Sequence, residues 1–257
     1  MRRCKMPRRA REKSSTGIYH VVLRGINRQI IFEEDEDYQK LLQTLQEYKE
    51  TSGYEIYGYC FMSNHIHLLI KEGEEDLGIV FRRIGARYVY WYNWKYNRRG
   101  HLFQDRYKSE AVENDGYFLT VLRYIHQNPL KAGIVKHLSD YPWSSYTEYA
   151  ANPTVCSTAF GLSLFSEDPE TATKLFKEFN LEKNNNQCLE YDQNMRWKDQ
   201  EAIDFIKKIG GIKSPTEIQN FEKEKRDEII EICKEKGLSI RQLQRLTGIS
   251  FGVIRKK

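Results

Sequence analysis

The sequence has little cysteine and no long hydrophobic run, and both shortages narrow what the protein can be. Its 5 cysteines are an odd number at wide spacings, with no CxxC pair. Neither a disulfide framework nor a zinc cluster is therefore expected. No apolar run approaches the roughly 18 residues of a membrane helix, and no apolar stretch follows the basic N-terminus as in a secretory signal. These shortages favour a soluble protein with a cytoplasmic location.

Positive charge is concentrated in two segments. The formal net charge is only +5. Residues 1–13 nevertheless contain seven Arg or Lys and one Glu, and residues 82–108 contain eight Arg or Lys and one Asp. Concentrated positive zones indicate a phosphate-rich partner such as a nucleic acid. A solvated tail and a charged helix face would give the same pattern.

The hydrophobic pattern divides the chain into a basic arm at 1–16, a mixed domain at 17–150, a linker at 151–197 and a helical unit at 198–257. Within the mixed domain, the periodicity predicts strands at 17–24, 54–61, 65–71 and 107–113, and helices at 35–51, 77–97 and 115–128. The last helix is expected to stop before Pro129 because a proline disfavours the α conformation of the residue before it.

This order of elements predicts an α+β fold. It is a ferredoxin-like antiparallel sheet with helices on one face, extended by one added helix. A short helix is also predicted at 168–179, within the linker.

The C-terminal segment has the pattern of a small all-helical domain. Helices are predicted at 199–208 and 215–236, followed by a third helix that Ser239 can cap. Gly248 allows a turn, and another helix begins near Ser250. Together with nearby arginines this predicts a DNA-binding helix-turn-helix, and a plain helical hairpin is the alternative.

Two histidines on one predicted strand form a candidate metal site. Alternate side chains of a strand share a face, so His65 and His67 lie together, opposite Ile66 and Leu68. Two such imidazoles can hold one divalent cation, although an isolated HxH also fits two structural histidines.

A tyrosine and an amide form a second constellation on the helix at 115–128. Tyr124 and Asn128 are four residues apart and so are neighbours on one helix face. A tyrosine hydroxyl beside an amide oxygen can meet a metal held elsewhere, although a buried tyrosine and a helix-terminating Asn-Pro would look the same.

Together these motifs resemble the single-tyrosine HUH transposases, and among them the REP-associated tyrosine transposases of bacteria. The resemblance covers residues 7–150. It rests on PRRAR at 7–11, YHVVLRGINRQIIF at 19–32, GYCFMSNHIHLLI at 58–70, GHLFQDRYKSE at 100–110 and YIHQNPLKAGIV at 124–135.

The resemblance implies an HUH nuclease palm that cleaves and transfers single-stranded DNA bearing hairpin, or palindromic, ends. His65 and His67 match the metal-binding histidines, and Tyr124 matches the nucleophile that forms a 5′-phosphotyrosine intermediate. Asn128 stands where related transposases have a glutamine as third ligand, which leaves that ligand open. The implied cofactor is Mg²⁺, or Mn²⁺ in its place. The implied setting is the bacterial nucleoid, with no membrane, as a monomer or a homodimer.

Several cations are candidate DNA contacts, by charge or by nearness to the predicted site. They are Arg8, Arg9, Arg11, Arg82, Arg83, Arg98, Arg99, Arg106, Lys108, Arg241 and Arg245.

Other functions remain open at this point. One is a catalytically silent, domesticated DNA-binding protein or regulator. Others are a replication-initiator or relaxase type of nuclease, and a metal phosphodiesterase without a covalent intermediate. The last of these would not need Tyr124.

Overall fold

The computed structural model describes residues 11–184, 188–189 and 199–256. Arg8 and Arg9, predicted as DNA contacts, lie outside the described residues. The chain divides into two compact units, Met1–Tyr191 and Asp192–Lys257, and each is described by itself.

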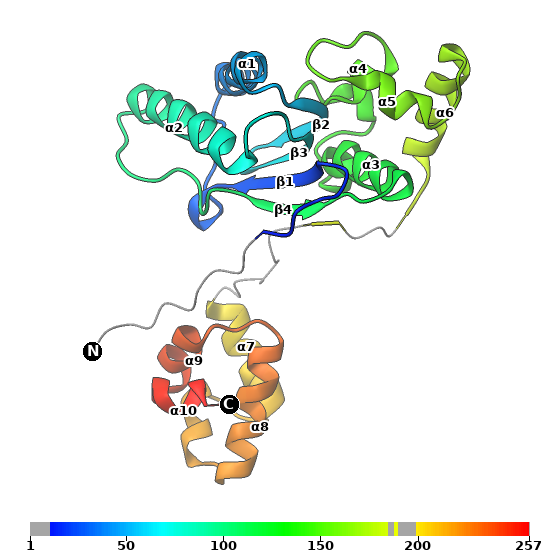
Figure 1. Ribbon diagram of the computed structural model, residues 1–257. Helices are drawn as coiled ribbons and strands as arrows, with labels where there is room; N and C mark the ends of the chain where they lie inside the picture. The colour runs from blue at the N-terminus through cyan, green and yellow to red at the C-terminus, as the bar shows by residue number, and fades with distance from the viewer. Residues whose placement is uncertain (1–10, 185–187, 190–198, 257) are drawn as a thin grey trace. The chain divides into compact units, whose positions relative to one another are not determined.

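The first unit is built on a four-stranded antiparallel sheet in the order β2–β3–β1–β4 (Figure 1). Its strands are β1 (Ile18–Arg24), β2 (Glu55–Met62), β3 (His65–Lys71) and β4 (Lys108–Ala111). This is the strand order of a βαββαβ unit, so the predicted α+β class and ferredoxin-like sheet are confirmed. β1 and β3 are the two central strands, and they carry the candidate residues.

Helices α1 (Asp35–Ser52) and α2 (Leu77–Lys95) cover one face of this sheet (Figure 1). α1 begins with a capping box between Glu34 and Asp37 and ends at Gly53, whose φ of 67° suits glycine. Aromatic residues of α2 contribute to the core on this face. Tyr88 and Tyr92 are buried there, and Trp91 packs partly buried against it.

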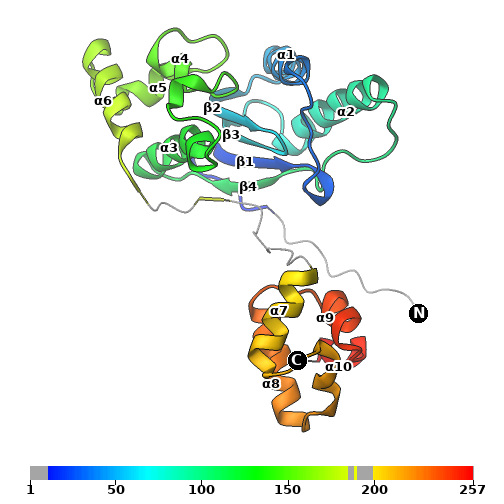
Figure 2. The same cartoon turned by 180° about the vertical axis from the view of Figure 1, so that it is seen from behind.

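Helix α3 (Asp115–Lys131) lies on the opposite face, a difference from the expectation that all helices share one face (Figure 2). That expectation holds for α1 and α2 alone. A glycine in β2 lets α3 approach closely, because a Cβ at Gly58 would lie 2.8 Å from Leu122 Cδ1. The apolar side of α3 therefore covers a second core.

The expected stop before Pro129 is also wrong, because α3 continues to Lys131. Pro129 lies in the last turn of the helix, where its missing N–H costs a single hydrogen bond. The helix then ends normally, with Ala132 N donating to Asn128 O at 2.9 Å.

The linker expected at 151–197 is wrong for its first half. After α4 (Tyr146–Ala150), the chain forms α5 (Thr158–Ser163) and α6 (Pro169–Leu181), which join the core under α3. Phe176 of α6 is fully buried. α6 includes the short helix predicted at 168–179. The folded part of the first unit therefore extends well past residue 150.

The second unit is entirely helical in its described part. It contains α7 (Asp199–Gly210), the 3₁₀ helix η3 (Pro215–Asn220), α8 (Lys223–Glu235), α9 (Ile240–Thr247) and α10 (Phe251–Arg255). The single helix expected at 215–236 is divided, because Phe221 and Glu222 are extended. Ser239 caps α9 and Gly248 ends it with a φ of 73°, as expected, and α10 follows Ser250.

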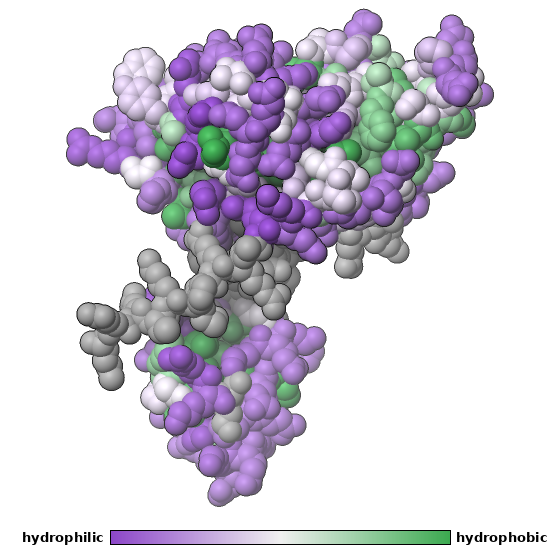
Figure 3. All heavy atoms as spheres, in the orientation of Figure 1, coloured by the Kyte–Doolittle hydropathy of each residue, from purple (hydrophilic) through white to green (hydrophobic). Residues whose placement is uncertain are grey.

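The visible surface of the first unit is mostly hydrophilic, with hydrophobic residues gathered around α4 to α6 (Figure 3). Short 3₁₀ turns, η1 (Ile26–Arg28) and η2 (Leu138–Asp140), complete this unit. Among the described residues, no helix combines the length and apolar character needed to cross a lipid bilayer.

Candidate active site

The two candidate ligand histidines lie on β3, on the face of the sheet that α3 covers. β3 pairs with β1 so that His65 stands opposite Arg24 and His67 opposite Val22. The intervening Ile66 points into the core under α1 and α2. His67 is 2% exposed and His65 is half-buried. The predicted sharing of one face is therefore present in the strand register.

Tyr124 reaches the same place from α3. Its ring is T-shaped to that of His67, with centroids 5.5 Å apart, and the rings of His65 and His67 are 5.0 Å apart. The side chain is 5% exposed, and the ammonium of Lys131 lies 5.5 Å from its ring centroid. Strand and helix thus bring the predicted histidines and tyrosine together.

Each candidate ligand histidine has a hydrogen-bond partner on its Nδ1 atom. His65 Nδ1 lies 2.6 Å from Asn64 Oδ1, and His67 Nδ1 lies 3.1 Å from Nε2 of His20. Partners of this kind orient the rings of metal-binding histidines. They leave Nε2 as the nitrogen with which each histidine would hold a cation.

Burial favours the neutral form of His20 and of His67 by lowering their pKa values. Desolvation lowers the pKa of His20 to about 3. Desolvation also lowers the pKa of His67 well below its usual value, and the charges of His65, His20 and Arg24 add to the effect. A neutral imidazole is the form that binds a metal, so a fully buried His67 is a ligand that need not lose a proton first.

Asn128 has one amide atom engaged and one available. Its Nδ2 donates to the backbone oxygen of Tyr124 at 2.9 Å, which leaves Oδ1 as the acceptor. The neighbouring Gln127 is buried and donates to the backbone oxygen of Asn180 at 2.8 Å. Its side chain therefore binds α6 and does not point to the candidate metal site. Asn128 is therefore the better candidate for a third ligand.

The donor set fits a divalent cation with open positions. In the part of the chain that the structure describes, no three His, Cys, Asp or Glu residues cluster as a metal site. Two imidazoles and an amide oxygen would instead leave coordination positions for water and for a substrate phosphate. Mg²⁺ prefers oxygen ligands, and Mn²⁺ accepts this mixed set more readily.

The candidate DNA contacts divide into engaged and available cations. Arg83 pairs with Glu75 at 2.6 Å, and Arg98 donates to Gln29 at 3.0 Å. Arg82 and Arg106, by contrast, are exposed on a cavity of about 450 Å³ between α2 and residues 101–106.

The other candidates have different surroundings. Arg99 is exposed, and Arg11 stacks on Tyr107 at 3.9 Å. Lys108 pairs with Val22 on the face of the two histidines. In the second unit, Arg241 is exposed and Arg245 pairs with Asp199 at 2.5 Å.

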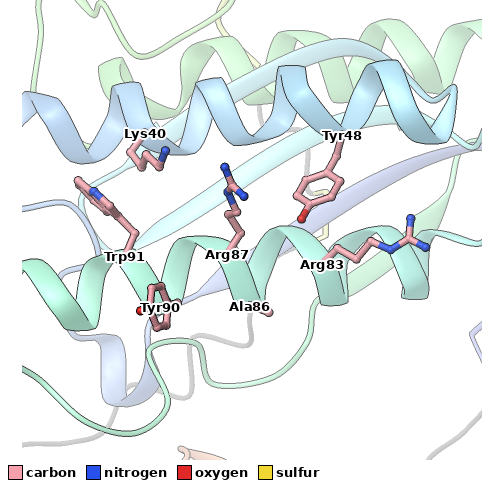
Figure 4. Close-up of a pocket in the computed structure, with 7 residues that line it drawn as sticks. All are labelled: Lys40, Tyr48, Arg83, Ala86, Arg87, Tyr90 and Trp91. Atoms are coloured by element: carbon pink, nitrogen blue, oxygen red, sulfur yellow. The ribbon is translucent and has the colours of Figure 1, made fainter.

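A second basic and aromatic cavity, of about 560 Å³, lies between α1 and α2 (Figure 4). It is on the side of the sheet away from Tyr124. Arg87, which points toward α1, pairs there with Glu47 at 3.2 Å. Its lining residues are Lys40, Tyr48, Arg83, Ala86, Arg87, Tyr90 and Trp91.

Sequence reasoning underrated His20 and overlooked Gly58. His20 belongs to neither of the two constellations drawn from the sequence, yet its ring contacts both His67 and Tyr124. Its position could have been found from the alternation along β1, which places His20 on the face of Val22 and Arg24. Gly58 gave no signal, because its role depends on the approach of a distant helix.

Residues 13–128 match the model of the family described as Transposase IS200 like. The match contains β1, β3 and α3 as far as Asn128. The part of the chain that carries the candidate site is therefore similar to IS200-like transposases.

The individual relatives are REP-associated tyrosine transposases, which confirms the resemblance drawn from the motifs. One, from Escherichia coli K12, is 27% identical over 136 residues, which are 52% of this chain and 78% of the relative. A candidate member from Haemophilus influenzae is 30% identical over 114 residues, 38% of this chain and 64% of its own length. A solved REP-associated tyrosine transposase bound to a REP hairpin covers 57% of this chain and 86% of its own, with 24% identity and a TM-score of 0.49.

Proposed function

We propose that the protein is a metal-dependent, single-stranded DNA endonuclease and strand transferase that acts on hairpin-bearing DNA. The observation that carries this proposal is the meeting of Tyr124 with His65 and His67 across the α3–sheet interface. The match of residues 13–128 to the IS200-like transposase family supports transposase chemistry, and one similar protein is bound to a REP hairpin.

In this proposal Tyr124 is the nucleophile. Its oxygen attacks a backbone phosphorus and displaces the 3′-oxygen, which leaves as a 3′-hydroxyl, while the phenol proton is lost. The product is a 5′-phosphotyrosine that conserves the energy of the broken bond. A strand with a free 3′-hydroxyl can then be joined without a nucleotide cofactor.

His65, His67 and Asn128 would hold Mg²⁺ or Mn²⁺. A cation bound there polarises the scissile phosphate and stabilises the charge that develops on it. The chain's own contribution is orientation: Asn64 holds the ring of His65, and α3 fixes the phenol. Exposed Arg82, Arg99 and Arg106, with Lys108 on the sheet, would bind the phosphate backbone.

The second unit would add DNA affinity through a helix-turn-helix formed by α9 and α10. Ser239 and Gly248 give it the expected cap and turn, and Arg241 is exposed on α9. Deleting residues 198–257 should therefore weaken DNA binding and spare cleavage of a short oligonucleotide. Loss of cleavage would instead assign this unit to the active site.

The test is a denaturing gel of the full chain with labelled single-stranded hairpins from its own genomic flanks. With Mn²⁺ or Mg²⁺, label should migrate with the protein. EDTA should abolish this adduct, and so should Tyr124→Phe. Tyr117→Phe is a matched control, because that tyrosine is also on α3 and donates to Glu110 instead.

A binding-only function is the second candidate. Tyr124 is 5% exposed, so a strand must gain access to it before reaction. Hairpins that are retained by the wild-type protein on a native gel, but never cut or linked, would favour a silent regulator.

A further inference from the structure

His20 occupies the centre of the site although no step of the proposed chemistry assigns it a role. It lies on β1 beside β3, and its side chain is fully buried. Its ring stacks on that of His67, with centroids 5.3 Å apart, and is T-shaped to Tyr124 at 5.9 Å. One residue thus contacts both the candidate ligand and the candidate nucleophile.

We propose that His20 is a positioning residue that accepts a hydrogen bond from His67 and so directs the free lone pair of His67 toward the cation. The contact is His20 Nε2 to His67 Nδ1, at 3.1 Å. This inference rests on the proposed function, because it requires that His67 holds a metal.

The reason lies in the proton count of two hydrogen-bonded imidazoles. A neutral imidazole has one N–H and one lone pair, on different nitrogens. If His20 were the donor, the proton of His67 would sit on Nε2, where it would block a cation. With His67 as the donor through Nδ1, its Nε2 carries the lone pair. Metal binding therefore selects the second arrangement.

His65 has the same arrangement with a different partner. Its Nδ1 lies 2.6 Å from Asn64 Oδ1, and an amide oxygen accepts only. The proton of His65 is thus on Nδ1, and its lone pair is on Nε2. Because both histidines have an acceptor at Nδ1, they present the same atom to a shared cation.

The unpaired nitrogen of His20 argues against a role in packing alone. Its Nδ1 is buried, and within the described ranges it has no hydrogen-bond partner. An apolar residue would fill this space without leaving a polar atom unsatisfied. The imidazole is explained by the bond that its other nitrogen makes.

The first experiment measures Mn²⁺ binding to the full chain by isothermal titration calorimetry. His20→Leu removes the acceptor and should weaken Mn²⁺ about 10- to 100-fold. His20→Gln supplies an amide oxygen at similar reach and should restore most of the affinity. His67→Leu gives the Mn²⁺ affinity that remains when the ligand itself is lost. Unchanged Mn²⁺ affinity in folded His20→Leu would overturn the inference, as would equal weakening in both His20 variants.

The second experiment uses the wild-type protein, so it does not depend on the folding of a variant. Long-range ¹H–¹⁵N spectra of ¹⁵N-histidine protein, titrated with Mg²⁺, report which ring nitrogen carries each proton. We expect His67 to be protonated on Nδ1 and His20 to be unprotonated on Nε2. The opposite tautomers in the presence of Mg²⁺ would overturn the inference.

The two proposals fail differently. A wild-type protein that binds no Mn²⁺ in calorimetry would overturn the metal site and the role of His20 together. Normal wild-type binding that His67→Leu abolishes and His20→Leu leaves intact would overturn the role of His20 alone.

Discussion

The two faces of the central sheet are formed by alternate residues of the same strands, yet within residues 11–184 only the face under α3 buries imidazole side chains. The face under α1 and α2 presents aliphatic residues such as Val21 and Leu68. The face under α3 presents His20, His67 and, from the helix, Tyr124. Apolar residues on both faces stabilise the fold, and the α3 face additionally carries buried polar groups that cost stability.

The largest expected effect removes chemistry and leaves the fold. In His67→Leu a ligand is lost and a buried polar ring becomes apolar. Cleavage should fall below detection, whereas the free energy of unfolding should fall by only about 1–3 kcal/mol, because His20 Nε2 loses its hydrogen-bond partner. The hairpin gel and urea unfolding measure the two quantities. If this variant cleaved DNA at the wild-type rate, His67 would not be a metal ligand.

The neighbouring residue on the strand should behave in the opposite way. Leu68→Ala empties space in the hydrophobic core and should lower the free energy of unfolding by about 2–5 kcal/mol. Cleavage per folded molecule should stay near the wild-type rate. Urea unfolding measures the stability, and active-site titration gives the cleavage rate per folded molecule. A variant that lost cleavage with only a small loss of stability would contradict a purely structural role for Leu68.

Acid should lower the free energy of unfolding because of the buried histidines on the α3 side of the sheet. Burial lowers the pKa of His126 and of His20 to about 3, below the unfolded value near 6.5. As the pH falls below 6.5, these histidines become protonated in the unfolded chain but stay neutral in the native protein. Stability should therefore drop by about 1.4 kcal/mol per pH unit for each such histidine.

His126 gives a control for this pH dependence that does not touch the candidate metal site. It lies on α3 away from Tyr124, and its Nε2 is 2.9 Å from Ser145 Oγ. His126→Asn should make the slope of unfolding free energy against pH shallower by one histidine's share between pH 6.5 and 4.5. An unchanged slope would contradict a neutral, buried His126.

The spacing between α3 and the sheet should have a smaller effect. Gly58→Ala places a methyl group against Leu122, and such overpacking costs about 1–3 kcal/mol. Adduct formation by Tyr124 should slow because α3 shifts. Adding Leu122→Ala should give a favourable coupling energy in a double-mutant cycle. Additive losses would show that the two residues do not meet.

The smallest expected effect concerns two adjacent arginines on α2. Arg82→Ala should weaken hairpin binding a few-fold and reduce the salt slope of the binding constant by about 1. Arg83→Ala should change it less, because that guanidinium already pairs with Glu75. Equal losses in a fluorescence titration across salt concentrations would contradict the distinction.

Local periodicity was enough to predict much of this molecule. Alternation along β3 placed His65 with His67, and helical spacing placed Tyr124 with Asn128. The fold class and the resemblance to REP-associated tyrosine transposases are confirmed, while the roles of these four residues stay predictions. The order of the motifs along the chain indicated that the strand and the helix form one site, because the periodicity within each element says nothing about contacts between them.

Contacts between distant segments could not be read in the same way. The face that α3 covers depends on Gly58 admitting Leu122. The helix at 169–181 was expected within a linker because its sequence is polar, yet its buried Phe176 completes a core built by α3 and α4. Pro129 misled because its effect depends on how near the helix end it lies.

The outer side of α3 has a practical consequence for cutting the protein into fragments. Arg123 pairs with Glu182 at 2.8 Å, and Gln127 bonds to the end of α6. The helix that carries Tyr124 is therefore held from both sides. A fragment ending near residue 150 would contain the whole matched family region and still lose one of these supports. The shortest piece expected to keep its tyrosine aligned ends close to residue 184.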